Sequence, residues 1–387
     1  MSPSPERALL ITGATGVVGG AVALELLRRN PGDVAYCLVR AADAAAAQRR
    51  LDDALAVAAT AYGHPDALAA LRPRLHAIPG DITAPGLGLD DAARATLRAA
   101  GPLHVFHAAA SLKDTEEALR EILAHNVVGT ERLLEAVLPL GVATFNHVST
   151  AYVCGRRTGD IDETLDRPRG FNNRYEQSKH YGEHLVVDHC EHHGVPWRLL
   201  RPSIVVGHAT TAQITGVSGF LGWALKLAAL DAAAGGALRT TRLRYVARAD
   251  AELNLIPVDS VAEDIAGIDA AGAATLGRAF HLTNQTPPTV VDLLGAITDA
   301  LGLAGVECVA PGAALDPLSA RLHRWTRFER PYVAATRRFR RDGDGAYAST
   351  RHGRVSLDPV LVGRMVGGVV ETWRRQQRDR TAAGASA

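Results

Sequence analysis

The sequence predicts an α/β fold in which helices cover both faces of a parallel sheet, followed by a smaller and mostly helical region. Short apolar runs alternate with longer amphipathic segments through the first half of the chain, which is typical of repeated strand–helix–strand units. The first apolar run leads directly into a turn with glycines at positions 13, 16 and 19. The alternation stops at His208, after which Gly, Thr and Ala dominate as far as Asn254.

Length and composition exclude several classes of protein. A chain of 387 residues with 47% hydrophobic content can bury a large core, as one α/β unit or as two closely joined domains. The net charge of +1 gives no overall attraction to nucleic acid or to anionic membranes. We expect neither a signal peptide nor a membrane span, because the polar start and the short apolar runs fit neither. The cysteines are scattered without a CxxC pair, which favours a reducing, cytoplasmic location.

The glycine turn has the order that a dinucleotide requires, namely a buried strand, a tight turn and a helix that ends near Arg29. Gly13 permits the turn, Gly16 lets the backbone approach a pyrophosphate, and Gly19 lets the helix pack against the strand. The N–H groups of the first helical turn then face the phosphates. Although the spacing is GxxGxxG instead of GxGxxG, this context predicts a Rossmann-type, doubly wound sheet.

The second strand, expected over 34–39, indicates which dinucleotide binds. An acidic residue at the end of this strand would bind the ribose 2′-hydroxyl of NAD. Arg40 stands there instead, and a guanidinium suits the 2′-phosphate of NADPH. A helix expected over 41–62 carries Arg50 as a second candidate phosphate ligand. The alternative is a solvent-exposed arginine at a strand end that binds no ligand.

The later strands follow at intervals that fit parallel strands with right-handed crossovers. The alanines after His107 are small enough to let the chain pass close beneath a flat ligand. Strands are expected at 75–78, 103–106, 144–148, 197–200 and 279–282, and Gly80-Asp81-Ile82 closes the first of these. A surface loop is expected at 156–174. The expected helices include 125–130, 220–230 and the segment starting at 256.

The residues that carry chemistry come at the start of a helix. Tyr175 and Lys179 are four residues apart and share one helical face. An ammonium beside a phenol is expected to lower the phenol pKa from about 10, which makes the phenol a usable proton donor. Ser149 and Thr150 follow the strand expected at 144–148, so their hydroxyls are candidates for the same site.

These motifs resemble the extended short-chain dehydrogenase/reductase superfamily over roughly residues 8–285. The resemblance rests on TGATGVVGG, GDI, HAAA, NVVGT, VSTAYV, YEQSK, LRPS and IPVDSVAEDI, which occur in the family's order. It implies that Thr150 polarises the substrate carbonyl and that Tyr175 is the general acid. It also implies that Lys179 binds the nicotinamide ribose and tunes Tyr175.

The resemblance implies a cofactor-binding set and a division of the chain. Residues 1–207 and 256–285 would form the dinucleotide-binding domain, and residues 208–255 and 286–387 the substrate-binding region. The implied cofactor-binding residues are Gly13, Thr15, Gly16, Val17, Val18 and Gly19 at the turn, Arg40 and Arg50 at the phosphate, Asp81 and Ile82 beside the adenine, His107, Ala108 and Ala109 along the cofactor path, Asn126 and Lys179 in support of the site, and Pro202 and Ser203 beside the nicotinamide.

A narrower resemblance is to the thioester reductase and fatty acyl-CoA reductase branch. It rests on YCLVRA followed by AAAAQRRL, on NHVSTAYV and on NLIPVDSVAEDI. It implies NADPH-dependent reduction of an acyl thioester, held by a carrier protein or by CoA, to an aldehyde and in some cases to an alcohol. The alternatives are a family member acting on a ketone, alcohol or nucleotide sugar, and a non-catalytic NADP(H)-binding regulator. The complete Thr150, Tyr175 and Lys179 set argues against the regulator.

Other polar clusters have simpler interpretations. The histidines at 189–193 end a helix, where they complement its C-terminus, and we expect no metal there. No GxSxG elbow supports a hydrolase. A tail from Thr381 to Ala387 is expected to be disordered. Two basic clusters have two possible interpretations. Each is either a solvated surface or a docking site for a phosphate-bearing thioester or an acidic carrier protein. The clusters are Arg239, Arg242 and Arg244, and the eight arginines 321, 324, 327, 330, 337, 338, 340 and 341.

Overall fold

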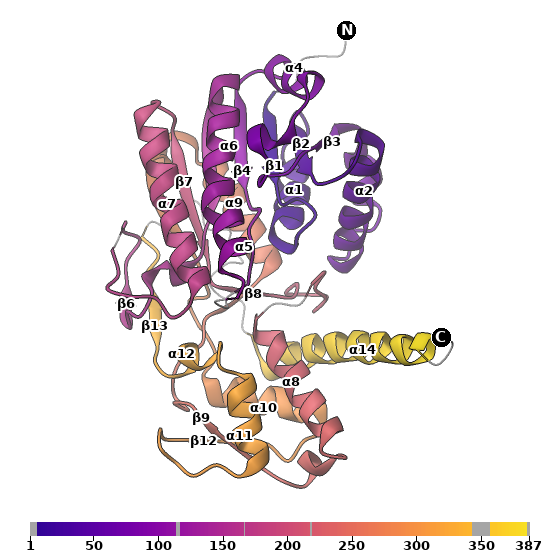
Figure 1. Ribbon diagram of the computed structural model, residues 1–387, viewed down its shortest axis with the longest axis vertical. Coiled ribbons are helices and arrows are strands. Elements are labelled where there is room, and N and C mark those ends of the chain that lie inside the picture. Colours follow the sequence, from indigo (N-terminus) through magenta and orange to yellow (C-terminus); the bar gives the residue numbers. More distant parts are fainter. Residues whose placement is uncertain (1–5, 114–116, 166, 217–218, 343–356, 385–387) are drawn as a thin grey trace.

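The computed structural model describes residues 6–113, 117–165, 167–216, 219–342 and 357–384. Figure 1 shows two parts, a layered sheet-and-helix body and a smaller helical region below it. The predicted α/β fold is confirmed.

A seven-stranded parallel sheet forms the centre of the larger part, in the order β11-β7-β5-β4-β1-β2-β3. The strand order reverses between β1 and β4, and a crevice at the carboxyl ends of the strands is the usual ligand site in such sheets. The strands are β1 Ala8–Thr12, β2 Val34–Val39, β3 Leu75–Pro79, β4 Leu103–His107, β5 Val142–Val148, β7 Trp197–Pro202 and β11 Arg278–Leu282.

Successive side chains of the strands enter two separate cores, one on each face of the sheet. Leu9 and Ile11 pack with α1, α2 and α9, whereas Leu10 packs with α4, α6 and α7. Both faces are therefore apolar, which explains the continuous apolar runs in the sequence. The helices of this part are α1 Val17–Arg29, α2 Ala44–Ala61, α3 Ala67–Leu71, α4 Asp91–Ala99, α5 Leu119–Leu123, α6 Gly129–Val137, α7 Arg174–His192 and α9 Val258–Ala270.

The glycine turn between β1 and α1 requires its glycines for steric reasons. Gly13 has φ of +76°, a conformation that residues with a side chain rarely adopt. A Cβ on Gly19 would stand 2.2 Å from the carbonyl oxygen of Gly13, and a Cβ on Gly13 would stand 2.6 Å from the backbone nitrogen of Ala109. The turn therefore packs directly against the start of α1 and against the chain leaving β4.

The helical region has its own apolar core, in which α10 and α8 pack against the long helix α14. Figure 1 shows α14 running sideways beneath the larger part. No helix within the described ranges is long and apolar enough to cross a membrane. The helices of this region are α8 Gly219–Ala233, α10 Val290–Leu301, α11 Pro317–Trp325, α12 Arg330–Val333 and α14 Pro359–Gly384. Three short strand pairs complete the fold. They are β8 Ile204–Val206 with β10 Leu255–Pro257, β9 Leu243–Val246 with β12 Val306–Val309, and β6 Gly159–Ile161 with β13 Arg337–Phe339.

Three expectations from the sequence need correction. The helix expected over 41–62 begins at Ala44, because the Asp43 side chain accepts a hydrogen bond from the Ala46 N–H and caps it. The loop expected over 156–174 contains β6, which pairs with β13 far along the chain. The tail expected to be disordered is helical from Thr381 to Gly384, and residues 385–387 lie outside the described residues.

Candidate active site

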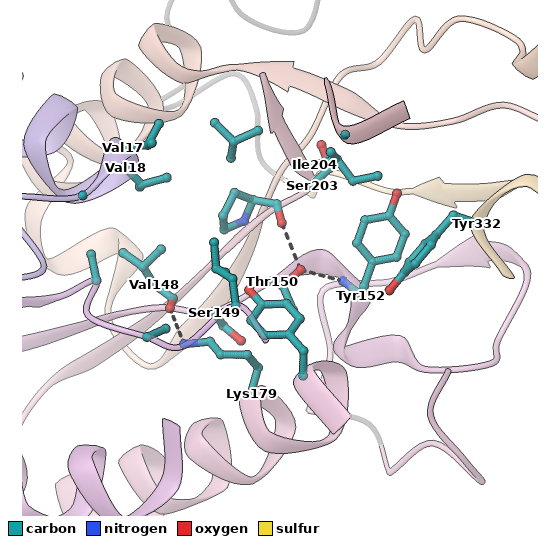
Figure 2. Close-up of a pocket in the computed structure, with 18 of the residues that line it drawn as sticks. Val17, Val18, Val148, Ser149, Thr150, Tyr152, Lys179, Ser203, Ile204 and Tyr332 are labelled. Carbon is teal, nitrogen blue, oxygen red and sulfur yellow. Dashed lines mark hydrogen bonds between the residues drawn. The ribbon is translucent and has the colours of Figure 1, made fainter. Parts of the chain in front are cut away.

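A cavity of about 540 Å³ lies where the carboxyl ends of the sheet strands meet the helical region. Figure 2 shows Val17 and Val18 on one side of it, Thr150 and Lys179 in the middle, and Tyr152 and Tyr332 on the other side. The cavity therefore joins the glycine turn to the C-terminal region through the predicted catalytic residues. The predicted residues that line it are Gly13, Gly16, Val17, Val18, Gly19, Ala108, Thr150, Tyr175, Lys179, Pro202 and Ser203.

Thr150 lies just beyond the end of β5 in extended backbone and begins a short 3-10 turn. Its hydroxyl accepts a hydrogen bond from the Tyr152 N–H at 3.3 Å and donates to the Pro202 carbonyl at 3.4 Å (Figure 2). Because the second contact is long, its hydroxyl proton is only weakly held. Thr150 can turn this proton towards an oxygen atom in the cavity.

Tyr175 and Lys179 are placed by the first turns of α7, which is capped by the Asn173 side chain. The Lys179 ammonium donates to the Val148 carbonyl at 2.7 Å and lies 3.3 Å from Nε2 of His147. Lys179 is buried, and burial lowers its pKa to about 8. The lysine thus ties α7 to the end of β5.

The structure corrects the expected effect of Lys179 on Tyr175. Exclusion of water raises the pKa of the Tyr175 phenol, and the negative charge of Glu176 raises it further. The Lys179 ammonium is directed to the Val148 carbonyl and does not lower the phenol pKa as predicted. Tyr175 is therefore protonated at neutral pH, which is the form that donates a proton.

His107 and Asn126 do not line the cavity, and they brace the chain behind it. His107 is hydrogen-bonded to the hydroxyls of Thr12 at 2.7 Å and Thr130 at 3.0 Å, and burial lowers its pKa to about 3. The Asn126 side chain accepts from the Ser111 N–H at 2.7 Å and donates to the Ser178 hydroxyl at 2.9 Å. It does so from a single π-helical turn between α5 and α6, which re-aims the side chain.

The polar residues predicted for the adenosine end gather at the carboxyl ends of β2 and β3. The Arg50 guanidinium donates to the Arg40 carbonyl at 2.8 Å, and both arginines are exposed. Burial acts to raise the pKa of Asp81, but hydrogen bonds from the Thr83 N–H and hydroxyl and the charge of Arg40 lower it overall. Arg40 and Asp81 therefore interact electrostatically, and the Arg50 guanidinium lies beside the backbone of Arg40.

Three further residues predicted to bind the cofactor, Thr15, Ile82 and Ala109, lie outside the cavity lining. Ile82 is buried in the core that contains Leu10, and Thr15 is an exposed residue of the glycine turn. The Ala109 N–H donates to the Thr12 hydroxyl at 3.2 Å, which holds the chain close to the turn. Neither Ile82, Thr15 nor Ala109 is among the residues that line the cavity.

Sequence reasoning missed the contact between the helical region and α7. The Tyr332 hydroxyl donates to the buried Glu176 carboxylate at 2.6 Å, and the Asn173 amide donates to the same hydroxyl at 2.7 Å. Tyr152 packs edge-on against Tyr332 with ring centroids 4.8 Å apart. The only signal in the sequence was an acidic residue directly after Tyr175, where a buried carboxylate requires partners.

The arginine segment 321–341 is not a single solvated helical face. Its first part forms the exposed side of α11, where Arg321 stacks over the Trp325 ring at 4.5 Å. In its last part Arg338 and Arg340 are exposed, whereas Arg337 is buried and the Arg341 guanidinium lies 3.1 Å from the buried Asp264 carboxylate. Within the described residues no group of three or more His, Cys, Asp or Glu side chains is placed to hold a metal ion.

A buried ion pair gives a prediction of stability. Arg201, at the end of β7, donates twice to the Glu183 carboxylate of α7 at 2.8 Å, and both side chains are almost fully buried. Glu183→Ala leaves the guanidinium buried without its partner, so we expect the free energy of unfolding to fall by about 3–5 kcal/mol. Urea denaturation followed by circular dichroism measures this change. Glu191→Ala, at an exposed position of the same helix, is the control, and equal losses for the two variants would contradict the prediction.

This seven-stranded sheet, its glycine turn and the Tyr175–Lys179 pair at its crevice define the class of the protein. It has the fold and motifs of the extended short-chain dehydrogenases/reductases, a class of nicotinamide-dependent oxidoreductases. The chain belongs to the NAD-binding family described as Male sterility protein, which it matches over residues 11–265.

Relatives within this group agree with the predicted branch. The chain is 31% identical over 303 residues to the isonitrile lipopeptide synthase of Mycobacterium tuberculosis, covering 73% of this chain and 12% of the synthase. It is 28% identical over 281 residues to a carboxylic acid reductase of Mycobacterium marinum, covering 68% of this chain and 23% of that protein. The chain thus spans less than a quarter of either relative.

Solved structures share the fold over nearly the whole chain. The terminal R domain from the myxalamid PKS-NRPS biosynthetic pathway superposes with a TM-score of 0.75 at 24% identity. The superposition covers 96% of this chain and 92% of that domain. At this identity the likeness shows the fold, which includes the C-terminal region.

Proposed function

We propose that the protein reduces acyl thioesters to aldehydes with NADPH. The observation that carries the proposal is the single cavity that joins the glycine turn, the three polar residues and an apolar chamber. The chamber is lined by Trp223, Phe328 and Val333 and has the character that an acyl chain requires. Kinship to a carboxylic acid reductase and to a lipopeptide synthase supports the same reaction class.

The residues around the glycine turn support NADPH as the cofactor. The glycine turn brings the backbone and the N-terminus of α1 to the edge of the cavity, where a pyrophosphate binds well. We assign Arg40 and Arg50 to the 2′-phosphate and Lys179 to the nicotinamide ribose. Ser203 lines the cavity, and its buried hydroxyl has no hydrogen-bond partner among the described residues, so we assign this residue to the nicotinamide end. When bound, NADPH supplies the hydride.

The chain's own residues act on the thioester oxygen. Thr150 and Tyr175 donate hydrogen bonds to the carbonyl oxygen and stabilise the negative charge that develops when hydride adds to the carbonyl carbon. The carbon–sulfur bond then breaks, the thiolate leaves and takes up a proton, and an aldehyde remains. If the aldehyde is reduced again, Tyr175 gives its proton to the alkoxide oxygen and an alcohol forms.

The proposal assigns a binding function to each part of the chain. We assign residues 1–207 and 256–285 to dinucleotide binding, and residues 208–255 and 286–387 to substrate binding. The thioester arrives on CoA or on a carrier protein, both of which bring anionic phosphate. The cysteines of the chain are unpaired, which supports a reducing, cytoplasmic compartment.

A substrate screen tests the proposed function. Purified protein is mixed with NADPH and with acyl-CoAs, acyl-carrier-protein thioesters, ketones or nucleotide sugars, and absorbance at 340 nm reports NADPH oxidation. We expect oxidation with thioesters and an aldehyde product that a hydrazine reagent traps. Oxidation with a ketone or nucleotide sugar but with no thioester would leave only the superfamily assignment standing.

The basic surface gives a prediction about the carrier of the thioester. Arg324 and Arg327 are exposed on and just beyond α11, and Arg327 directly precedes the cavity residue Phe328. Charge reversal of both to Glu is expected to raise KM for an acyl-CoA severalfold, because rim charges attract anionic ligands by up to about 1 kcal/mol each.

The matching controls separate this effect from damage to the fold. Added salt should reduce the difference in KM, and KM for a short uncharged aldehyde should stay the same. Charge reversal at Arg98, an exposed residue of α4 on the larger part, should leave KM for the acyl-CoA unchanged. An unchanged KM for the acyl-CoA in the Arg324/Arg327 variant would show that these arginines are a solvated surface and do not bind the substrate.

A further inference from the structure

The far end of the cavity contains one carboxylate in otherwise apolar surroundings. Trp223 and Leu253 line this end, together with Phe328 and Val333. Glu329 lines it as well and is 9% exposed. A charged group is rarely buried at an apolar wall unless a partner compensates for the lost water.

The compensation that the protein supplies is incomplete. Oε1 of Glu329 accepts a hydrogen bond from the Lys226 ammonium of α8. Oε2 is buried and accepts no hydrogen bond within the described part of the chain. A carboxylate has about four acceptor positions, so one ammonium leaves most of its capacity unused. The unmet acceptor costs free energy that a bound donor recovers.

The backbone leaves room for a ligand beside this carboxylate. Gly222 lies one helical turn before Lys226 on α8 and also lines the cavity. A Cβ at Gly222 would stand 3.9 Å from Oε1 of Glu329 as its nearest neighbour. Gly222 therefore contributes no side chain between the cavity and Oε1 of this carboxylate.

We propose that Glu329 selects acyl chains that carry an N–H donor, either an amine or an amide, at a distance from the thioester. The inference rests on the proposed function and names the substrate class of the same site. A plain alkyl chain fills the apolar wall but leaves Oε2 without a partner. A site that is built to hydrogen-bond its substrate rejects an analogue that lacks the donor.

The test compares three CoA thioesters of equal main-chain length, hexanoyl, 6-aminohexanoyl and 6-acetamidohexanoyl, by kcat/KM from NADPH oxidation. Wild-type protein is expected to prefer at least one of the two nitrogen-bearing chains by about tenfold or more, the scale of one hydrogen bond to a charged acceptor. Glu329→Gln keeps the size and removes the charge, and should reduce that preference about tenfold. Which nitrogen-bearing chain is preferred distinguishes an amine from an amide.

Two further variants keep the test decisive. Glu307→Gln, at an exposed carboxylate on β12, should leave the preference unchanged. Gly222→Ala places a methyl group beside Oε1 at an ordinary contact distance, so it should fold and raise KM for the preferred chain. Gly222→Ala serves as the test variant if Glu329→Gln has a lowered melting temperature or no longer binds NADPH.

The outcomes separate this inference from the proposed function. Reduction of all three thioesters with a preference that neither Glu329→Gln nor Gly222→Ala changes would overturn the role of Glu329 and leave thioester reduction intact. The same holds if wild-type protein prefers hexanoyl-CoA. No NADPH oxidation with any of the three, or with the broader set of thioesters, would remove the proposed function itself.

Discussion

Tyr175→Phe is expected to lower kcat for thioester reduction by at least about 10²-fold while the Kd for NADPH stays nearly constant. The change removes only the phenol hydroxyl, and loss of one hydrogen-bond donor to a developing oxyanion costs about 10²–10³-fold in kcat. An interaction that forms mainly in the transition state affects kcat and kcat/KM together and leaves cofactor affinity unchanged. Steady-state kinetics and NADPH fluorescence titration measure the two quantities.

Tyr181 provides the matched control on the same helix. It lies six residues after Tyr175, is 45% exposed, and accepts a hydrogen bond from Gln177 at 3.0 Å, away from the cavity lining. Tyr181→Phe should keep full turnover. Near-full activity in Tyr175→Phe would mean that another residue stabilises the developing oxyanion.

Lys179→Ala should behave differently from Tyr175→Phe. The ammonium holds the end of β5 through the Val148 carbonyl and is the proposed ligand of the nicotinamide ribose. Both turnover and NADPH affinity should therefore fall. A loss of turnover alone would indicate that Lys179 acts only through Tyr175.

The central sheet was predictable because its strands are long and buried on both faces. Leu9 and Leu10 point to opposite cores, so the run around them is apolar throughout and ends at the glycines of the turn. The short pairs were not predictable. β6 and β13 have three residues each and pair across more than 170 positions of the chain, and no periodicity marks such segments.

The positions of the candidate catalytic residues were predictable for a topological reason. Parallel strands place their carboxyl ends at one edge, so Thr150 after β5 and Pro202 at the end of β7 had to lie near each other. The pKa of Tyr175 was not predictable, because it depends on the exclusion of water and on the Glu176 charge. Glu329 and Tyr332 come from a segment without clear periodicity, so the sequence did not indicate that they reach the cavity.

The predicted preference for NADPH over NADH depends on Arg40 and Arg50, and the structure shows how these two residues contact each other. Arg50 lies on α2, and its guanidinium donates to the backbone carbonyl of Arg40, so Arg50 lies beside the end of β2. Arg49 is exposed on the same helix and makes no such bond to Arg40 among the described contacts. Arg49→Ala is therefore the matched control for Arg50→Ala.

We expect wild-type protein to bind NADPH more tightly than NADH, and Arg40→Asp to raise the Kd for NADPH by more than tenfold. Each hydrogen bond to a charged group contributes about 1.5–3 kcal/mol, so Arg40→Asp combined with Arg50→Ala should raise it by roughly 10²-fold or more. The Kd for NADH should not rise, since an Asp at a strand end can bind the ribose 2′-hydroxyl. Fluorescence titration of both cofactors measures these constants. Equal affinity of the wild-type protein for NADPH and NADH would show that Arg40 and Arg50 are solvent-exposed arginines at a strand end, without a phosphate to bind.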